Sequence, residues 1–249
     1  MDILRRHEVF EIELLEKLKN GNFLKPLVFG GGTMLRLCYE LNRYSADLDF
    51  WFIKKLDQRE YFQKLKEGLA EFYELTDARI KFKTLLLEIR SKSYPRRLKV
   101  EIRREIKKCD FQEKIAFSKY ATKQVILRAH TLEQTLRNKI EAALDRKDVR
   151  DFFDLEFLLR QGVALNSSVD ELGELKDIAG SFKENDYSVS LGSILESDMR
   201  RYYIKNKFDY LIRKINLSLL KDKGTLKGVS VNDLVMDRRN VRRQEHSEL

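Results

Sequence analysis

Residues 27–53 read LVFGGGTMLRLCYELNRYSADLDFWFI. The apolar run 27–29 predicts a short buried strand, the three glycines after it predict a tight turn, and residues 34–41 predict a helix. Over residues 46–53 the side chains alternate, which predicts a half-buried strand. A strand, a glycine turn and a helix are therefore followed by a strand that presents two aspartates on one side.

These two aspartates, Asp47 and Asp49, form a candidate metal site. Residues two apart on a strand point the same way, with alpha carbons roughly 6.6 Å apart. Mg²⁺ and Mn²⁺ take carboxylate oxygens as ligands, and paired ions in phosphoryl-transfer sites lie roughly 3.5–4 Å apart. A third acid is expected on a neighbouring strand. The alternation over 98–103 makes Glu101 the first choice, with Glu88 on the preceding strand as the alternative.

The turn at Gly31, Gly32 and Thr33 supplies a candidate binding site for the nucleotide. Glycine permits close approach of the backbone, and the amides at a helix N-terminus attract an anion. A Gly-Gly-Thr turn on its own usually does no more than start a helix. Its position just before the aspartate strand makes a nucleoside triphosphate the expected substrate, with its phosphates at this turn.

The remainder of the chain favours an α+β fold in two parts. Residues 1–130 are expected to form the core with a mixed sheet, and 131–249 a helical domain that ends in a charged tail over 238–249. Further helices are predicted at 1–20, 58–73, 132–144 and 149–159, and further strands at 80–90, 98–103 and 124–127.

Composition restricts the partners. The net charge of +9 and the pI near 9.3 favour an anionic partner such as nucleic acid or a nucleotide. Seven of the residues from Arg96 to Lys108 are basic and two are acidic, a pattern that usually means a solvated surface. Two cysteines, the absence of an export signal and the absence of a long apolar run indicate a cytoplasmic protein without a membrane role.

Two sets of residues resemble the AbiEii/AbiGii toxin family of nucleotidyltransferases. The first is Gly31-Gly32-Thr33 with Leu35, followed by Arg43, Ser45 and Asp47-Leu48-Asp49-Phe50. The second is a helix with Lys139, then Arg146, and a helix that begins Arg150-Asp151-Phe152-Phe153-Asp154. The order and separation match over roughly residues 27–160.

The resemblance implies a polymerase-beta-like nucleotidyltransferase core joined to a helical domain, with the nucleotide in the cleft between them. It assigns catalysis to Asp47, Asp49, Lys139 and Asp154, to which the strand alternation described above adds Glu101. It assigns nucleotide binding to Gly31, Gly32, Thr33, Arg43, Ser45, Lys139, Arg150 and Asp151. It also implies a toxin that adds nucleotides to an RNA acceptor, the tRNA 3′ end, with an antitoxin protein encoded nearby.

Physical chemistry leaves alternatives open for these residues. Asp151 and Asp154 share a helix face, so one of them is expected to orient Lys139 towards phosphate. The same charges are also compatible with exposed ion pairs such as Arg150 with Asp154, each of which contributes only roughly 0.3–0.5 kcal/mol. Trp51 is expected in the core, with stacking on a base as the alternative.

The function has alternatives as well. One is a nucleic-acid-binding or partner-binding protein on a catalytically degenerate transferase fold, for which the basic stretch Arg96 to Lys108 is the support. The other keeps the nucleotidyl transfer and changes the acceptor to a protein or a small molecule.

Overall fold

The computed structural model describes residues 2–222, and these form one mixed sheet with helices on both sides. The strand order is β3-β4-β5-β2-β1-β7-β6. β2 runs parallel to β5 and β1 parallel to β7, whereas the other neighbours are antiparallel. The expected α+β class with a mixed sheet is confirmed. The strands are β1 (Leu27–Gly30), β2 (Asp47–Phe52), β3 (Glu74–Ile80), β4 (Thr84–Arg90), β5 (Leu98–Arg103), β6 (Phe111–Phe117) and β7 (Gln124–His130).

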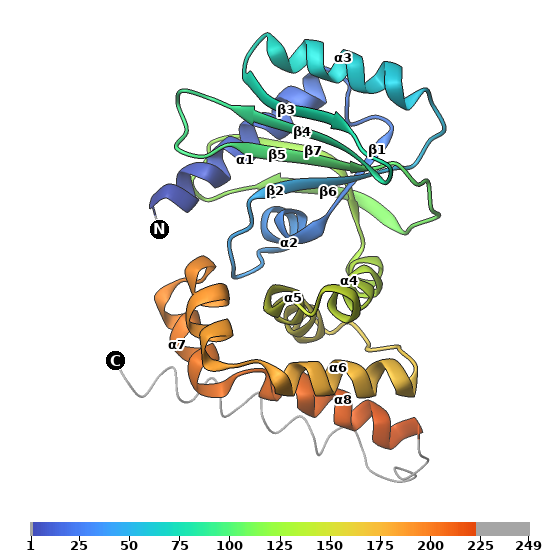
Figure 1. Cartoon of the computed structure of the whole chain (residues 1–249), viewed down its shortest axis with the longest axis vertical. Helices are drawn as coiled ribbons and strands as arrows, with labels where there is room; N and C mark the ends of the chain where they lie inside the picture. Colours follow the sequence, from blue (N-terminus) through green and yellow to red (C-terminus); the bar gives the residue numbers. More distant parts are fainter. Residues whose placement is uncertain (1, 223–249) are drawn as a thin grey trace.

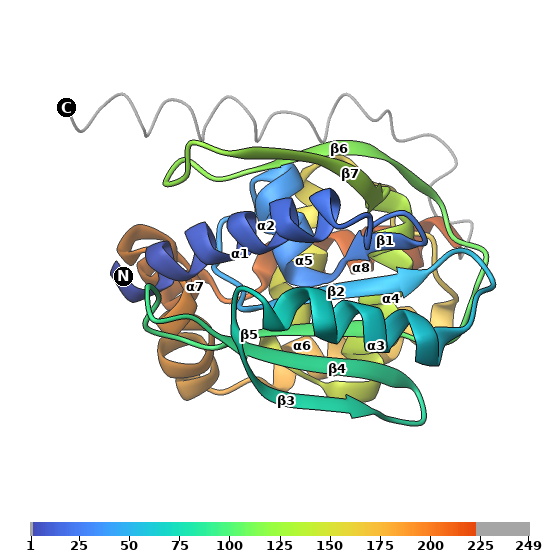
Figure 2. The same cartoon turned by 90° about the horizontal axis from the view of Figure 1, so that it is seen from above.

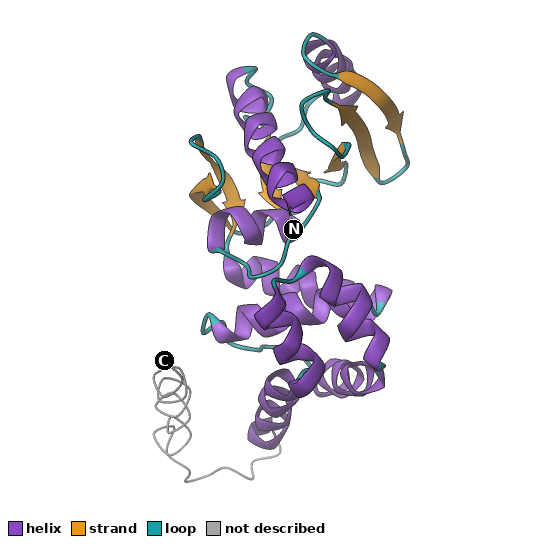
Figure 3. Ribbon diagram, turned by 90° about the vertical axis from the view of Figure 1, so that its left-hand side faces the viewer, coloured by secondary structure: helices purple, strands orange, loops and turns teal. Residues whose placement is uncertain are grey.

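The helices fall into two groups. Figure 1 shows α1 and α3 on the side of the sheet away from the C-terminal helices, and Figure 2 shows both helices lying over the sheet. In Figure 3 the strands share one end of the molecule with the N-terminal helices, and α4 to α8 fill the other end. The helices are α1 (Asp2–Asn20), α2 (Gly31–Tyr39), α3 (Gln58–Ala70), α4 (Leu132–Arg146), α5 (Val149–Arg160), α6 (Val169–Ser181), α7 (Ser197–Asn206) and α8 (Asp209–Asp222), with short helical turns η1 (Asp186–Leu191) and η2 (Gly192–Ile194) between α6 and α7.

Local sequence explains where the main helices begin. The Asp57 side chain accepts hydrogen bonds from two backbone amides of α3, and the Thr131 side chain accepts one from α4. Ser168 and Glu171 form a reciprocal capping box at α6. Each side chain satisfies amides that a helix start leaves without a backbone partner.

Two strands were not predicted from sequence, and both lie at the edges of the sheet. β3 and β6 carry mixtures of polar and apolar residues because an edge strand is only partly buried. The strand expected over residues 80–90 is present but shorter, spanning Thr84–Arg90. The chain turns after Ile80, where the Lys81 amide donates to the Thr84 carbonyl at 2.8 Å, and β4 starts at Thr84.

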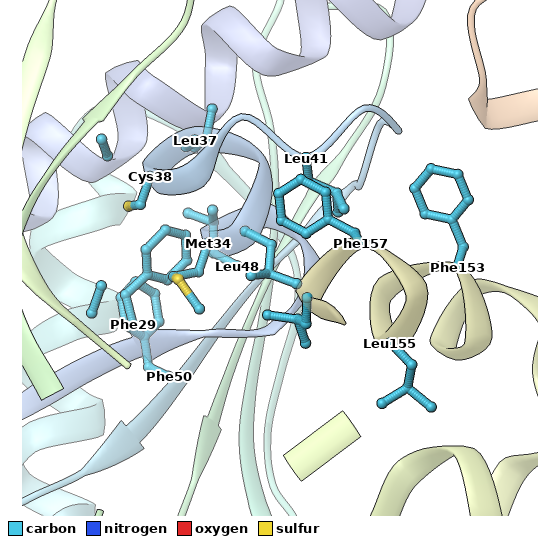
Figure 4. Packing of buried hydrophobic residues seen from close by; sticks show 14 of the residues in the cluster. Phe29, Met34, Leu37, Cys38, Leu41, Leu48, Phe50, Phe153, Leu155 and Phe157 are labelled. Carbon is cyan, nitrogen blue, oxygen red and sulfur yellow. The ribbon is translucent and has the colours of Figure 1, made fainter. Parts of the chain in front are cut away.

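A continuous hydrophobic core links the sheet to the helices. Figure 4 shows side chains from the sheet, from α2 and from α5, and all belong to one buried cluster. The division of the chain near residue 130 therefore stays a prediction, although the last described strand ends at His130. The charged tail expected over 238–249 lies outside the described residues. Among residues 2–222, no helix is both long and apolar enough to cross a membrane.

Candidate active site

Asp47 and Asp49 lie on β2, in register with the neighbouring strand β5. Asp49 pairs with Glu101, and Asp47 pairs with Lys99. Paired residues on adjacent strands point to the same face. Asp49 and Glu101 are therefore neighbours on two strands whose spacing is roughly 4.8 Å. The other face of β2 consists of Leu48, Phe50 and Phe52, all buried. Apolar burial on one face therefore fixes the acids on the other.

The acids line a large cleft between the sheet and helices α4 and α5. Its volume is about 1500 Å³. It contains Asp47, Asp49 and Glu101 together with both halves of the glycine turn, Gly31 and Gly32. Residues from the helices form the opposite wall, including Lys139, Arg146, Arg150 and Asp151.

The acids crowd negative charge at one point of the cleft. Burial, together with the charges of Asp47 and Glu101, raises the pKa of Asp49 to about 7. One ammonium group offsets part of this charge. The Lys99 Nζ lies 3.5 Å from Asp47 Oδ2 and 3.7 Å from Glu101 Oε1.

The donor set fits a hard divalent cation. Asp47, Asp49 and Glu101 lie on the same face of adjacent strands, and burial together with the two neighbouring carboxylates raises the pKa of Asp49. In the conformation described for residues 2–222, no three acid, histidine or cysteine side chains are drawn together at metal-binding separation, and Lys99 lies between two of the acids. Asp47, Asp49 and Glu101 are the residues that would hold the ion.

The glycine turn is packed directly against the acids and against Arg43. Gly31 has a φ of 76°, and a Cβ there would lie 2.3 Å from Asp49 Oδ2. A Cβ on Gly32 would lie 2.5 Å from Arg43 Nη2 and 2.9 Å from Ser45 Oγ. Only glycine fits at these positions without displacing the site. The Thr33 side chain is fully buried and donates to the Asp47 carbonyl at 2.6 Å, so it braces β2 instead of facing the cleft.

A buried network of charges joins the loop before β2 to helices α4 and α5. Arg43 donates to both oxygens of Asp154, at 2.6 and 2.7 Å. The Lys139 Nζ lies 2.5 Å from Asp154 Oδ2 and 2.9 Å from Asp151 Oδ1, and Arg146 donates to both oxygens of Asp151. Although burial acts to raise it, the charges of Arg43 and Lys139 hold the pKa of Asp154 below its usual value. Asp154 therefore stays ionised between its two cations.

This network changes the view of α5 taken from the sequence. Asp154 is fully buried and is not among the residues that line the cleft, so it reaches the site only through Arg43 and Lys139. The exposed ion pair of Arg150 with Asp154 is not formed. Arg150 instead pairs with Asp148, the residue that caps α5. Ser45 and Arg150 both line the cleft.

The choice between Glu101 and Glu88 is decided by strand order. Glu88 lies on β4, opposite Lys99, one strand farther from the aspartates. Its carboxylate accepts from Thr76 at 2.7 Å and from Arg97 at 2.9 Å, and it does not line the cleft. Glu101 is therefore the third acid at the site.

Two aromatic residues, Trp51 and Phe82, also line the cleft. From the sequence, Trp51 was expected in the core, with stacking on a base as the alternative, and Phe82 was not selected. Trp51 lines the cleft with its ring 4.8 Å from that of the buried His130. Burial, followed by the charge of Arg137, lowers the pKa of His130 to about 4. Phe82 also lines the cleft, and sequence analysis missed it because that stretch was taken as a single strand. Residues 81–83 contain none of the residue types that commonly mark a turn, so no local signal for it was available.

A mixed sheet that holds two aspartates and a glutamate beside a glycine turn, with a helical unit closing the cleft, is the architecture of a nucleotidyltransferase. The sequence comparison gives the particular family: residues 13–201 match the model for the nucleotidyl transferase AbiEii toxin of type IV toxin–antitoxin systems, and the chain belongs to this family. A search of curated proteins finds no match.

Solved structures with low sequence identity share this fold. JHP933 from Helicobacter pylori has 23% identity and a TM-score of 0.54, covering 88% of this chain and 96% of its own. A protein from H. pylori described as a candidate nucleotidyltransferase has 24% identity and a TM-score of 0.52, covering 84% and 96%. MenT4, a nucleotidyltransferase toxin from Mycobacterium tuberculosis, is a looser match, with 17% identity, a TM-score of 0.44 and coverage of 84% and 88%.

Proposed function

We propose that this family member transfers a nucleoside monophosphate from a nucleoside triphosphate to the 3′ end of an RNA, with tRNA as the acceptor. In this proposal it is the toxin of a toxin–antitoxin pair, acts in the cytoplasm and is restrained by an antitoxin protein. The observation that carries the proposal is the register of Asp49 with Glu101 inside a cleft that also holds the glycine turn and Lys139.

The residues of the chain divide the work of binding and reaction. The triphosphate lies against Gly31 and Gly32, where the start of α2 offers backbone amides. Lys139, only 8% exposed and fixed by two acids, neutralises phosphate charge from the opposite wall. The acceptor hydroxyl forms a bond to the α-phosphorus, the bond to the β-phosphate oxygen breaks, and pyrophosphate leaves. Glu101 takes the hydroxyl proton.

The three acids also account for a need for divalent metal. Mg²⁺ or Mn²⁺ held by Asp47, Asp49 and Glu101 would neutralise the phosphates and favour the ionised acceptor oxygen. Without such an ion the pKa of Asp49 is raised to about 7. A bound cation would favour the ionised carboxylate, which supports the assignment.

The acceptor assignment is supported by the charge at the outer end of the cleft. Arg103, Lys107 and Lys108 line it beyond the acids, together with Lys83 from the hairpin between β3 and β4. A cationic surface beside a transferase site favours a polyanionic acceptor over a small neutral one.

Incubation of the purified protein with nucleoside triphosphates, Mg²⁺ and total cellular RNA tests this proposal. Sequencing of RNA 3′ ends is expected to find untemplated nucleotides on tRNA. The Asp47→Asn variant is expected to leave the ends unchanged. Unmodified RNA ends with the unaltered protein, together with transfer of the nucleotide to a protein or a small molecule, would contradict the RNA acceptor.

A second candidate, a binding protein on a degenerate transferase fold, is supported by Lys99. Its ammonium group lies between Asp47 and Glu101, where a cation would bind. This candidate predicts that toxicity in cells survives Asp47→Asn and is lost on charge reversal at Arg103. The proposed enzyme predicts that toxicity is lost with Asp47→Asn.

A further inference from the structure

The turn between β3 and β4 places Phe82 at the rim of the cleft. Phe82 is 91% exposed, the largest exposure among the large hydrophobic residues described over 2–222. A single exposed phenylalanine is common on protein surfaces and is not evidence of a site. Phe82 differs because it lines the same cleft as the three acids.

The backbone around Phe82 is held in place. Arg104 donates through Nη1 to the carbonyls of Lys81 and Phe82, at 2.9 and 3.3 Å. Its Nε donates to Gln58 Oε1 at 3.0 Å, and the Gln58 amide donates back to the Arg104 carbonyl at 2.7 Å. The exposed ring therefore projects from a braced turn, so little conformational entropy is lost when a flat partner stacks on it.

The surroundings of Phe82 are strongly basic. Lys81 and Lys83 flank it in sequence, and Thr84 pairs with Arg103 across the two strands. Within residues 2–222, Lys83, Arg103 and Lys108 form no ion pair, whereas Lys107 pairs with Glu105. The cations beside the ring are thus available for phosphates.

The geometry relates this group to the acids. Glu101 and Arg103 lie on the same face of β5, and Arg103 pairs with Trp51 just as Glu101 pairs with Asp49. Glu101 lies opposite Leu86 and Arg103 lies opposite Thr84, so at roughly 3.3 Å per residue the turn that carries Phe82 begins about 6.6 Å beyond Glu101 along the strand direction. A chain that ends at the acids would pass Trp51 and Arg103 and then reach Phe82.

We propose that Phe82 is a stacking contact for a base of the single-stranded RNA acceptor, upstream of its reacting 3′ hydroxyl. Lys83, Arg103 and Lys108 hold the adjacent phosphates. Single-stranded nucleic acid is bound in this way by aromatic faces combined with a cationic groove. The inference rests on the proposed function, because it takes the acids as the point that the RNA 3′ end reaches.

Direct binding tests this assignment without any turnover. A fluorescently labelled single-stranded RNA of 12 nucleotides is titrated with the full chain in low salt, in the absence of triphosphate. Phe82→Ala is expected to weaken binding on the order of ten- to a hundredfold, the effect of losing one stacked base. Phe82→Trp is expected to bind at least as tightly as the unaltered chain. Phe72→Ala is the matched control, since Phe72 is 55% exposed and does not line the cleft.

The outcomes separate this inference from the proposed function. Unchanged affinity of Phe82→Ala for the RNA overturns the stacking contact. This is the result expected if the hairpin binds a protein partner instead. An equal loss on a fully double-stranded RNA of the same length also overturns it. Failure of the unaltered chain to transfer nucleotides would contradict the proposed function and leave the binding result intact. Unchanged melting curves for Phe82→Ala, Phe82→Trp and Phe72→Ala establish that all three variants fold.

Discussion

Arg43 and Asp154, which are 111 residues apart in sequence, form a bidentate ion pair that is buried at the junction of the sheet and the helices. The side chain of Arg43 passes beneath Gly32 of the glycine turn, and Asp154 contacts Lys139. The pair therefore connects both walls of the cleft. Its main role is to fix the position of one wall relative to the other.

Removal of Arg43 is expected to destabilise the protein severely. Arg43→Met leaves the Asp154 carboxylate buried with one cation, and the free energy of unfolding is expected to fall by about 3–5 kcal/mol. Arg43→Met with Asp154→Leu is expected to cost less than the sum of the single changes. Urea unfolding measures both. Arg150→Ala, which breaks an exposed pair on the same helix, is the control and should cost less than about 1 kcal/mol. Additive costs at Arg43 and Asp154 would contradict the coupling.

The contact between Gly31 and Asp49 predicts a loss of activity that exceeds the loss of stability. Gly31→Ala introduces a Cβ 2.3 Å from an Asp49 oxygen and also strains a φ of 76°. Gly162→Ala is a matched control, because Gly162 has a φ of 91° with nothing near its Cβ. Both variants are expected to lose about 1–2 kcal/mol of unfolding free energy. Only Gly31→Ala should lose nucleotidyl transfer, and equal activities would contradict the packing argument.

Lys139 is expected to contribute to triphosphate binding more than to stability. In Lys139→Met, Asp154 keeps Arg43 and Asp151 keeps Arg146, so neither acid loses all its partners. Affinity for a nucleoside triphosphate, measured by calorimetry, should fall on the order of tenfold to a hundredfold, which corresponds to one charge-assisted hydrogen bond. Lys147→Met removes an exposed lysine nearby that pairs with Glu174 and should leave affinity unchanged. An unchanged affinity of Lys139→Met for the triphosphate would contradict a role of Lys139 in binding it.

Stability is expected to depend on pH through His130. Burial and the charge of Arg137 lower its pKa to about 4, against 6.5 for a free histidine. Between these values the folded chain binds fewer protons than the unfolded chain, so unfolding free energy rises with pH and is lost as pH falls. His130→Gln should reduce the gain in unfolding free energy between pH 4 and 6.5 by about 1–3 kcal/mol. Part of the slope should remain, because burial also lowers the pKa of His7. An unchanged slope would contradict a buried neutral His130.

Sequence reasoning succeeded where periodicity carries the information. The alternation around Asp47 and Asp49 predicted their shared face because the opposite face is filled by apolar residues, and the structure has that pattern. The same alternation on β5 predicted the direction of Glu101. Strand order was needed to choose between Glu101 and Glu88, because order depends on long-range pairing that a single sequence does not encode locally.

The rest of the site depends on contacts between distant segments. The pairing of Arg43 with Asp154 gives no local signal, so Asp154 was expected to take part in catalysis, whereas it is buried behind Arg43, which does line the cleft. The edge strands β3 and β6 lack a regular pattern because neighbours cover them on one side only. Phe82 was missed because residues 80–90 were expected to form one continuous strand, so the turn that exposes it was not predicted.

The position of the label on the triphosphate tests most directly whether the acids of β2 and β5 catalyse nucleotidyl transfer. RNA is incubated with the protein and Mg²⁺ and with triphosphate labelled at either the α- or the γ-phosphate. The α label alone should enter RNA, and Asp49→Asn should reduce the rate at least about 10²-fold. Glu88→Gln, one strand farther away, should retain it. Transfer of the γ label, or full activity in Asp49→Asn, would contradict a nucleotidyltransferase site at these acids.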